Sequence, residues 1–223
     1  MSPKIILKAA SEWLPRRLGV ITASELACLF KLNPYGSVNA MIKKKVEGSG
    51  ITDSIYMRAG RIMEPGVIIA VNEALKEDFR LVTSGNLNEK VFYESDECLL
   101  GATPDAENVR GNLLEAKTCG AAKFNSWRTE PPAHYVLQLI AQIICCHSSP
   151  EGYLAVLSTE FPFKLIVWKF ILTSELRSAI ITEVNSFWDQ IKNNNSYEHN
   201  LELIREVKLN IKENSSLVYQ PLS

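Results

Sequence analysis

The segment from Gly101 to Lys117, GATPDAENVRGNLLEAK, constrains this chain more than any other stretch. Asp105 follows a proline, and an apolar strand predicted at the end of the segment carries Glu115 and Lys117. Side chains of a strand alternate between its two faces, so Glu115 and Lys117 point to one side and Ala116 to the other. The pattern therefore predicts an acid and an amine side by side on one strand.

A polar turn separates Asp105 from this strand. It spans Asn108–Asn112 and contains Gly111, which is typical of the connection in a β-hairpin. A hairpin folds the chain back on itself, so Asp105 is expected beside Glu115. The segment thus predicts two carboxylates and one lysine within reach of a shared cation.

This group of side chains suits metal-assisted hydrolysis of a phosphodiester. Mg²⁺ prefers oxygen ligands and is commonly held by one or two carboxylates together with substrate phosphate and water. The metal polarises the phosphoryl oxygen and lowers the pKa of the attacking water. Lys117 can hold or deprotonate that water, since a nearby metal and partial burial favour a lowered amine pKa. The alternative for the same residues is a surface hairpin with an exposed ion pair.

The composition predicts one cytoplasmic domain over residues 1–223. The chain has 223 residues, of which 46% are hydrophobic, enough for one core. The longest apolar run, Val136–Cys146, is too short to span a membrane. The N-terminus lacks the layout of a signal peptide, and the five cysteines lack the spacing of a disulfide framework. A net charge of −1 argues against a generally basic surface, so DNA contacts would have to come from local clusters or from geometry.

A second candidate site lies near the N-terminus. Thr22 and Glu25 have the spacing of a capping box, which predicts a helix from about Ala23. The free N–H groups and the macrodipole at a helix N-terminus attract anions. Ser24 would present its hydroxyl in the first turn, and Arg17 could add a bidentate contact to phosphate. The alternative is an ordinary capped helix beside a solvated arginine.

Helices and strands follow one another along the rest of the chain. Hydrophobic periodicity and capping residues predict helices over about 37–46, 61–79, 121–130, 134–147, 174–195 and 201–211. Short strands are predicted over 91–94, 98–102, 153–157 and 165–172. Pro65 fits the second of these helices if that helix begins near Arg61, and otherwise kinks it. The residues after the last helix are expected to be mobile.

Three polar residues share one side of the helix predicted over 134–147. Tyr135, Gln138 and Gln142 are spaced at i, i+3 and i+7, so this stripe either faces water or lines a site. The Cys145-Cys146-His147 run at the end of the helix is expected to hold buried small residues rather than metal ligands, because adjacent helix positions point in different directions. Glu64 is either a surface acid or a third carboxylate of the acidic site.

Five motifs, taken in order, resemble those of the phage lambda exonuclease family of viral-type recombination nucleases, within the PD-(D/E)xK superfamily. They are RLGVITASE at Arg17–Glu25, GRIME at Gly60–Glu64, Thr103-Pro104-Asp105, Glu115-Ala116-Lys117 and YVLQ at Tyr135–Gln138. The resemblance implies an α/β fold with a restriction-endonuclease-like core, in which a central mixed β-sheet is flanked by helices. It also implies a helical N-terminal part and a C-terminal helical extension.

The resemblance implies roles for the residues of the hairpin. Asp105 and Glu115 would bind Mg²⁺, for which Mn²⁺ could substitute, and the backbone carbonyl of Ala116 would be a further ligand. Lys117 would position and activate the attacking water. Thr103 stands where the family has serine and keeps the hydroxyl. Ala116 is smaller than the family's leucine, which matters little where only its carbonyl is needed.

The resemblance also implies roles outside the hairpin. Glu64 and Gln138 would complete the catalytic pocket. Arg17 and Ser24 would hold the 5′-phosphate of the digested strand. Met57, with its neighbour Tyr56, would occupy the place of an apolar wedge that separates the two DNA strands, at a cost of a few kcal/mol of unstacking.

The activity implied is a Mg²⁺-dependent 5′→3′ exodeoxyribonuclease that digests one strand of duplex DNA from its ends. It would release mononucleotides and leave 3′ overhangs for a single-strand annealing protein, in the cytoplasm of a bacterial host if phage encoded. The family is a ring-shaped homotrimer, and a ring around DNA would reconcile processivity with a near-neutral charge. The alternatives are a restriction-like endonuclease on the same fold and an inactive module that binds DNA ends.

Overall fold

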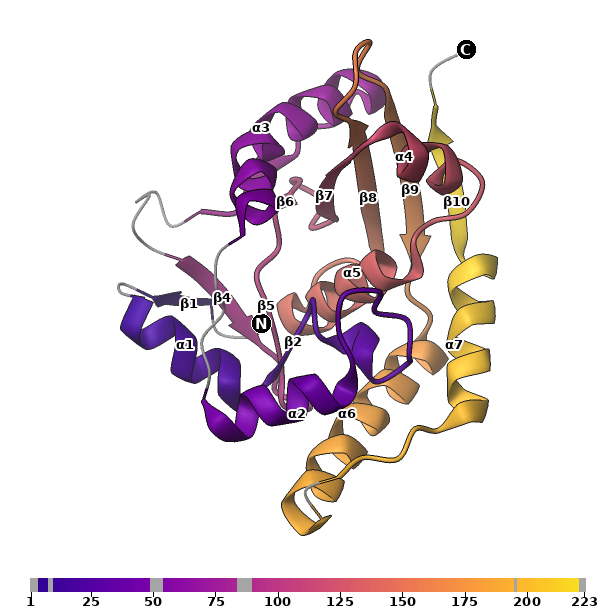
Figure 1. Ribbon diagram of the computed structural model, residues 1–223. Helices are drawn as coiled ribbons and strands as arrows, with labels where there is room; N and C mark the ends of the chain where they lie inside the picture. The colour runs from indigo at the N-terminus through magenta and orange to yellow at the C-terminus, as the bar shows by residue number, and fades with distance from the viewer. Residues whose placement is uncertain (1–3, 8–9, 49–53, 84–89, 195, 221–223) are drawn as a thin grey trace.

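The computed structural model describes residues 4–7, 10–48, 54–83, 90–194 and 196–220. The described strands form two sheets (Figure 1). The larger sheet has the strand order β10-β9-β8-β7-β6-β3, and the smaller has the order β1-β4-β5-β2. In the larger sheet β7 and β8 run parallel and the other pairs antiparallel, so the sheet is mixed, as predicted.

The strand bounds agree closely with the sequence-based predictions for the middle of the chain. The larger sheet contains β3 (Arg80–Leu81), β6 (Ala106–Glu107), β7 (Leu113–Cys119), β8 (Glu151–Ser158), β9 (Leu165–Ile171) and β10 (Ser215–Tyr219). The smaller sheet contains β1 (Lys4–Leu7), β2 (Ile21–Thr22), β4 (Lys90–Glu94) and β5 (Leu100–Ala102).

The helices account for most of the remaining described chain. They are α1 (Ala10–Gly19), α2 (Val38–Glu47), α3 (Ile55–Leu75), α4 (Ala121–Trp127), α5 (Ala133–Cys146), α6 (Ser174–Asn194) and α7 (Leu201–Glu213), with a short 3₁₀ helix, η1, at Leu26–Cys28. No described helix is both long enough and apolar enough to cross a membrane.

Helices α3 and α5 pack on opposite faces of the larger sheet. Leu114 of β7 is buried in a cluster with Val67 and Val71 of α3, whereas Leu113 is buried in the cluster that contains α5. This is the strict alternation of a strand that is covered on both faces. Residues 115 and 117 therefore share the α5 side of the sheet with Leu113.

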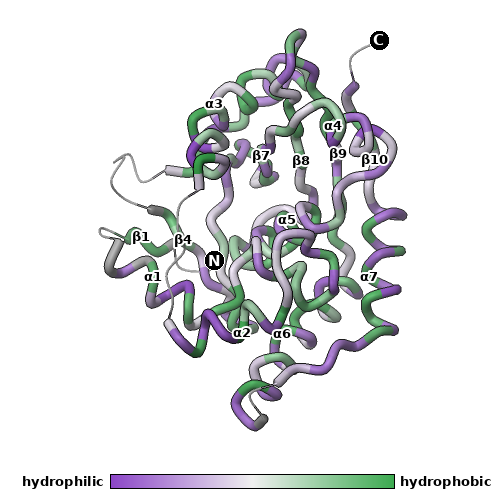
Figure 2. Tube along the Cα trace, in the orientation of Figure 1, coloured by the Kyte–Doolittle hydropathy of each residue, from purple (hydrophilic) through white to green (hydrophobic). Residues whose placement is uncertain are grey.

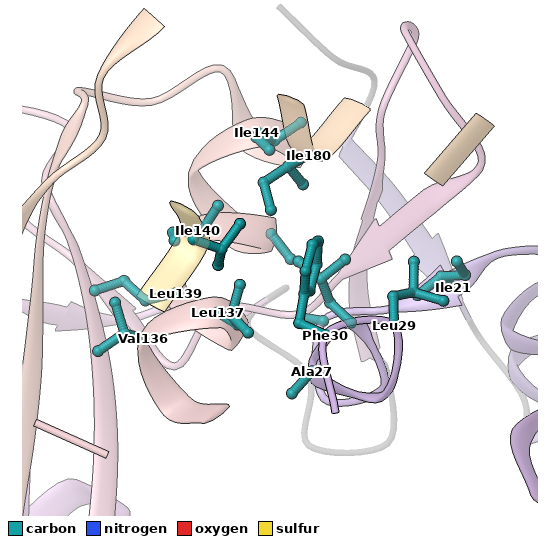
Figure 3. Packing of buried hydrophobic residues seen from close by; sticks show 14 of the residues in the cluster. Ile21, Ala27, Leu29, Phe30, Val136, Leu137, Leu139, Ile140, Ile144 and Ile180 are labelled. Atoms are coloured by element: carbon teal, nitrogen blue, oxygen red, sulfur yellow. The ribbon is translucent and has the colours of Figure 1, made fainter. Parts of the chain in front are cut away.

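Helix α5 is the centre of the main core. Most of its residues are buried, including Leu137, Ile140 and Ile144. Figure 3 shows them clustered with Phe30, which follows η1, and with Ile180 of α6. Helix α7 buries only one side, through Ile204, Val207 and Ile211, and its turns alternate between hydrophobic and hydrophilic residues in Figure 2. The burial of α5 fixes the position of any polar side chain that it carries toward β7.

Three sequence-based predictions were wrong in detail. The capping box at Thr22 opens a turn and the 3₁₀ helix η1 rather than an α-helix from Ala23. Helix α3 begins at Ile55, where the Ser54 side chain accepts a bond from the Met57 amide, so Pro65 lies inside the helix. Pro65 is exposed, and the carbonyl that it leaves without an amide partner can be solvated.

The third error concerns the C-terminus, which was expected to be mobile. Residues 215–219 instead form β10, which pairs antiparallel with β9. Without β10, β9 would be the edge of the larger sheet and its outer backbone groups would lack partners. Covering that edge gives these residues a defined structure.

Candidate active site

The β6–β7 hairpin brings Asp105 to Glu115, as predicted. Its turn is held by Asn108, whose side-chain oxygen accepts bonds from the amides of Arg110 (3.1 Å) and Asn112 (3.0 Å). Gly111 takes a positive φ of 76°, which a glycine adopts without strain. Ala106 of β6 is paired with Leu114, so one further step of the register places Asp105 opposite Glu115. Directly opposite residues of an antiparallel pair point to the same face.

Strand β6 is short, and this leaves the edge of β7 open at the site. Beyond Ala106, a side chain replaces the strand partner: the Ala116 amide donates to Asp105 Oδ2 over 2.9 Å. The N–H and C=O of one strand residue point toward the same neighbour. The carbonyl of Ala116 therefore points to the same side as Asp105, away from the strand β8 that pairs on the other edge.

The carboxylate of Glu115 is fully buried and contacts two side chains. Lys117 forms an ion pair with Glu115 Oε1, and Gln142 of α5 donates its amide to Glu115 Oε2. The same Gln142 nitrogen lies 3.4 Å from the backbone carbonyl of Thr103. Gln142 thus ties the strand that carries Glu115 to the segment that leads into Asp105.

Burial and mutual repulsion disfavour two charged carboxylates at this site. Burial raises the pKa of Glu115, the nearby Asp105 raises it further, and the pKa reaches about 7 although Lys117 and Gln142 oppose the shift. Burial also raises the pKa of Asp105, against the opposing effects of Lys117 and the Ala116 amide. A cation bound between the two carboxyl groups would reduce their electrostatic repulsion and favour their ionised forms.

The sequence-based expectation of a lowered pKa for the Lys117 amine depends on a bound metal and stays a prediction. Burial acts to lower its pKa, as expected, but the charges of Glu115 and Asp105 outweigh burial and raise the pKa above its ordinary value. The Lys117 amine also lies 4.9 Å from the ring centroid of Tyr135, a cation–π contact that the sequence did not reveal. Without a metal, the two carboxylates therefore favour the charged form of Lys117.

The donor set fits a hard divalent cation. It offers two buried carboxylates that repel each other, from Asp105 and Glu115, and the inward backbone carbonyl of Ala116. Oxygen donors of this kind suit Mg²⁺ or Mn²⁺ and do not suit soft metals. The acidic pair and the lysine thus have the chemistry that metal-assisted hydrolysis requires.

A second group of possible metal ligands lies on the surface. Ligand atoms of Asp96, Glu97 and His147 lie within 4.8 Å of one another, and all three residues are exposed. Asp96 Oδ1 lies 2.8 Å from His147 Nε2, and Glu97 pairs with Arg177. Asp96 is thus bonded to His147 and Glu97 to Arg177, so each carboxylate of this exposed group already has a side-chain partner. The expectation of buried residues for the Cys145-Cys146-His147 run holds for Cys145, whereas Cys146 is half-buried and His147 is exposed because the helix ends there.

Gln138 and Glu64, the two further residues predicted for the catalytic pocket, lie in different environments. Gln138 is half-buried, and among the described residues no hydrogen bond joins its amide to the hairpin. Gln142, one helical turn further on, takes the buried contact instead. The polar stripe predicted on this helix included Gln142, but the YVLQ motif pointed to Gln138 alone. Glu64 is half-buried on α3, one turn before the buried Val67 and Ile68. The roles of Gln138, Glu64 and the Thr103 hydroxyl remain predictions.

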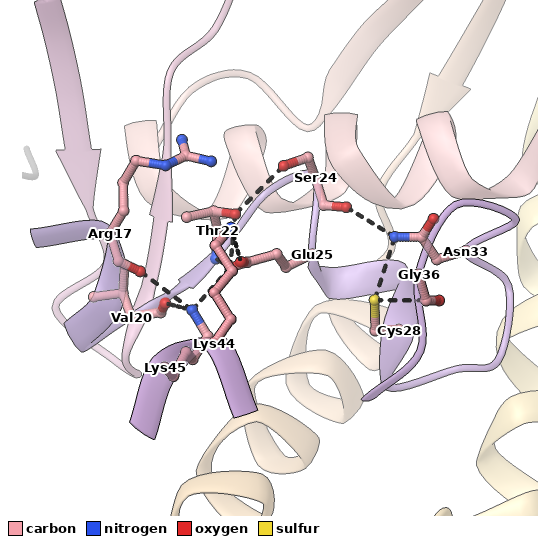
Figure 4. Close-up of polar contacts among 10 residues, drawn as sticks. All are labelled: Arg17, Val20, Thr22, Ser24, Glu25, Cys28, Asn33, Gly36, Lys44 and Lys45. Atoms are coloured by element: carbon pink, nitrogen blue, oxygen red, sulfur yellow. Dashed lines mark hydrogen bonds and ion pairs between the residues drawn. The ribbon is translucent and has the colours of Figure 1, made fainter. Parts of the chain in front are cut away.

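The N-terminal candidate pocket is built around a partly buried ion pair between Lys45 and Glu25 (Figure 4). Lys45 of α2 donates to Glu25 Oε2 (2.8 Å), to the Val20 carbonyl (2.6 Å) and to the Arg17 carbonyl (3.2 Å). Glu25 also accepts from the Thr22 amide over 3.0 Å. Burial acts to raise the pKa of Glu25, but Lys45 and the Thr22 bonds outweigh it and the pKa is lowered.

This arrangement leaves Arg17 and Ser24 at the front of the pocket. The Ser24 hydroxyl is exposed and lies 3.4 Å from that of Thr22. Figure 4 shows the Arg17 guanidinium on the same side as these hydroxyls. Burial lowers the pKa of Arg17, an effect that Glu25 opposes. Because η1 replaces the predicted α-helix, an anion here would depend on side chains more than on a helix dipole. Binding of phosphate remains a prediction.

The predicted wedge residues begin helix α3. Tyr56 and Met57 are exposed, at 85% and 44% respectively, and the neighbouring Ile55 is exposed at 78%. Such a group of exposed apolar side chains usually marks a binding surface. Separation of DNA strands by these residues remains a prediction.

The larger mixed sheet, the covering helices and the acid–lysine hairpin together define the class: nucleases with a restriction-endonuclease-like fold that act on DNA. A family model, described as a YqaJ-like viral recombinase domain, matches residues 12–149. The chain belongs to this family of viral-type recombinases, which confirms the resemblance carried by the five motifs.

Solved structures share the fold at low sequence identity. The alkaline exonuclease LHK-Exo from Laribacter hongkongensis matches with a TM-score of 0.62 and 19% identity, over 90% of this chain and 95% of that one. The same values describe the match to a crystal structure of LHK-Exo in complex with dAMP. A phage-related exonuclease from Haemophilus somnus 129PT matches with a TM-score of 0.54 and 11% identity, over 79% of this chain and 96% of that one. A comparison with curated protein sequences found no match.

Proposed function

We propose that this protein is a Mg²⁺-dependent 5′→3′ exodeoxyribonuclease that digests one strand of duplex DNA from its ends. The observation that carries the proposal is the convergence of Asp105, Glu115 and Lys117 at the open edge of β7. The fold relative LHK-Exo, named as an alkaline exonuclease, has been crystallised with the mononucleotide dAMP. Release of 5′-mononucleotides is the corresponding product here, with 3′ overhangs left behind.

In this proposal the hairpin holds the metal and orients the attacking water. Bound between Asp105 and Glu115, Mg²⁺ would polarise the phosphoryl oxygen and acidify the water. Gln142 fixes one oxygen of Glu115 and leaves the other beside Lys117. The Lys117 ammonium donates hydrogen bonds to the water and to the charge that develops on the phosphate.

The polarity of digestion would be set by the Arg17 and Ser24 pocket. A guanidinium and a hydroxyl on one side of the pocket suit the terminal 5′-phosphate. A 5′-phosphorylated duplex should therefore be digested faster than a 5′-hydroxyl duplex, and Arg17→Ala should shrink this difference. An equal preference in both proteins would remove Arg17 from the pocket.

One assay tests the activity and its rivals. Linear duplexes labelled at either end, a nicked circle and a closed circle are incubated with Mg²⁺ and compared. Digestion from 5′ ends supports the proposal, cutting of the closed circle indicates an endonuclease, and binding without cutting indicates an end-binding module. Lys117→Ala should abolish digestion and leave binding of DNA and metal largely intact. Lys212→Ala, at an exposed lysine of α7, serves as the matched control.

We further propose the assembly and partner that go with this activity. A homotrimeric ring would keep the enzyme on DNA without many phosphate contacts, which suits the net charge of −1. A single-strand annealing protein would take up the 3′ overhang. Light scattering should detect a closed oligomer, whereas a processive monomer would contradict the ring.

A further inference from the structure

The loop from residue 33 to residue 36 joins the two candidate pockets. Its first residue, Asn33, donates from its side-chain amide to the Ser24 carbonyl over 3.3 Å, and its side-chain oxygen accepts from the Tyr35 amide over 2.9 Å. The loop is thereby attached to the segment that carries the predicted 5′-phosphate contact (Figure 4). The loop contains none of the predicted catalytic residues and none of the predicted phosphate contacts.

The side chain of Tyr35 reaches the catalytic lysine through aromatic neighbours. Its ring packs edge-on against His134 at a centroid distance of 5.7 Å, and the His134 ring lies 4.0 Å from that of Tyr135. Tyr135 is the ring that faces the Lys117 amine. On the other side of Tyr35, the Lys123 amine of α4 donates to the Tyr35 hydroxyl over 2.9 Å.

These contacts hold Tyr35 while leaving its ring open to solvent. The residue remains 63% exposed, although Asn33 bonds its amide, His134 packs against its ring, and Lys123 bonds its hydroxyl and lies 5.1 Å from its ring centroid. An exposed aromatic side chain with this many restraints loses little conformational entropy when a ligand packs on it. The exposed part of the ring is thus a prepared aromatic surface on a loop that contacts both sites.

The chemistry of the proposed reaction specifies what must lie between those pockets. An exonuclease that releases 5′-mononucleotides binds a terminal phosphate and a scissile phosphate that flank a single nucleoside. If Arg17 and Ser24 take the first phosphate and Lys117 faces the second, the first base of the digested strand lies beside the residues that connect them. Tyr35 belongs to that connection.

We propose that Tyr35 stacks on the terminal base of the digested strand, with Lys123 holding its hydroxyl. This inference rests on the proposed function and deepens it by naming the residue that receives the base. Stacking is sequence-tolerant because every base has a π face, and it is worth about 1–3 kcal/mol per base, or about fivefold to 150-fold in affinity. Tyr35 would therefore position any of the four nucleotides for hydrolysis.

The test compares two 5′-phosphorylated duplexes that differ only in the first nucleotide of the digested strand, which carries either adenine or no base. For the wild-type protein the abasic end should raise KM about tenfold, within the range above. Tyr35→Ala should raise KM on the adenine end to the abasic value, so that the ratio between the two substrates falls to about one. Tyr35→Phe keeps the ring and should retain most of the ratio. Phe163→Ala, an aromatic side chain of similar exposure (62%) on the β8–β9 connection, should leave the ratio unchanged.

Other outcomes overturn the inference. A wild-type ratio of one shows that the terminal base is not recognised. An increase in KM by Tyr35→Ala that is equal for both substrates shows that Tyr35 only supports the loop. If the wild-type protein digests neither end of a linear duplex, the proposed function itself fails. The fluorescence of 2-aminopurine at the 5′ end then decides the inference without turnover: quenching that Tyr35→Ala removes supports stacking, and equal quenching contradicts it.

Discussion

Lowering the pH from about 8 to about 6 should weaken Mg²⁺ binding to this site by about tenfold, because Glu115 must lose its proton to act as a ligand. The magnitude follows from the pKa of about 7 that burial and the neighbouring Asp105 give Glu115. With that pKa, about ten in eleven Glu115 side chains are ionised at pH 8 and about one in eleven at pH 6, a difference of about 1.4 kcal/mol in binding free energy.

The direction follows from competition between protons and metal. A raised carboxyl pKa means that the folded protein holds the proton up to a higher pH, so affinity for Mg²⁺ is highest above pH 7 and decreases as the pH is lowered. The pKa of Asp105 is also raised, which acts in the same direction. A carboxylate with the ordinary glutamate pKa of 4.5 would stay almost fully ionised over this range and would give almost no change.

Isothermal titration calorimetry measures both the change of Mg²⁺ affinity with pH and the release of protons on binding. The dissociation constant is determined at about pH 6 and about pH 8, and at pH 7 the titration is repeated in buffers that differ in ionisation enthalpy. Binding at pH 7 should release about half a proton from Glu115. Glu115→Gln should bind the metal weakly and lose this proton release, whereas Glu213→Gln, at an exposed site on α7, should behave as wild type. Equal affinity at both pH values, without proton release, would refute the reasoning.

Three substitutions test the packing and the polar contacts. Gly101→Ala should destabilise the fold by about 1–3 kcal/mol in urea denaturation, because its Cβ would lie 2.5 Å from the buried ring of Phe92; unchanged stability would contradict this packing. Gln142→Leu should cost about 1.5–3 kcal/mol at about pH 8 by removing the donor to the Glu115 carboxylate, whereas Gln138→Leu should cost much less. A larger cost for Gln138→Leu would reverse the two assignments. Lys45→Met should cost about 1–3 kcal/mol, since it removes the nearest cation from the Glu25 carboxylate and the amine donor from the carbonyls of Arg17 and Val20, while the Thr22 bonds to Glu25 remain; unchanged stability would show that water replaces the amine.

The acid–lysine hairpin could be predicted from the sequence because its geometry is local. The turn is set by residues within the Asn108–Asn112 segment, and strand alternation alone places Glu115 and Lys117 on one face. The same holds for most helices and strands of the middle of the chain, whose periodicity and caps lie within each element. The ordered motifs then indicated the family before any contact was known.

Other features depended on residues that are far apart in the chain. The N-terminal capping box was real as a pair of hydrogen bonds from Thr22 to Glu25, yet the α-helix it predicted did not form. Lys45 binds the same carboxylate from α2, so a distant residue sets how the segment packs. The strand β10 depends in the same way on the open edge of β9.

The sequence by itself determined the hairpin, the facing pair of Glu115 and Lys117, and the family. Only the tertiary structure decided that Gln142 rather than Gln138 contacts Glu115, that Lys117 forms an ion pair with a fully buried Glu115, and that the Tyr35 ring packs against His134. The physical reason is that strand alternation and turn geometry act over a few residues. By contrast, burial, electrostatic repulsion and contacts between α5, β7 and the loop at residues 33–36 exist only after the chain has packed.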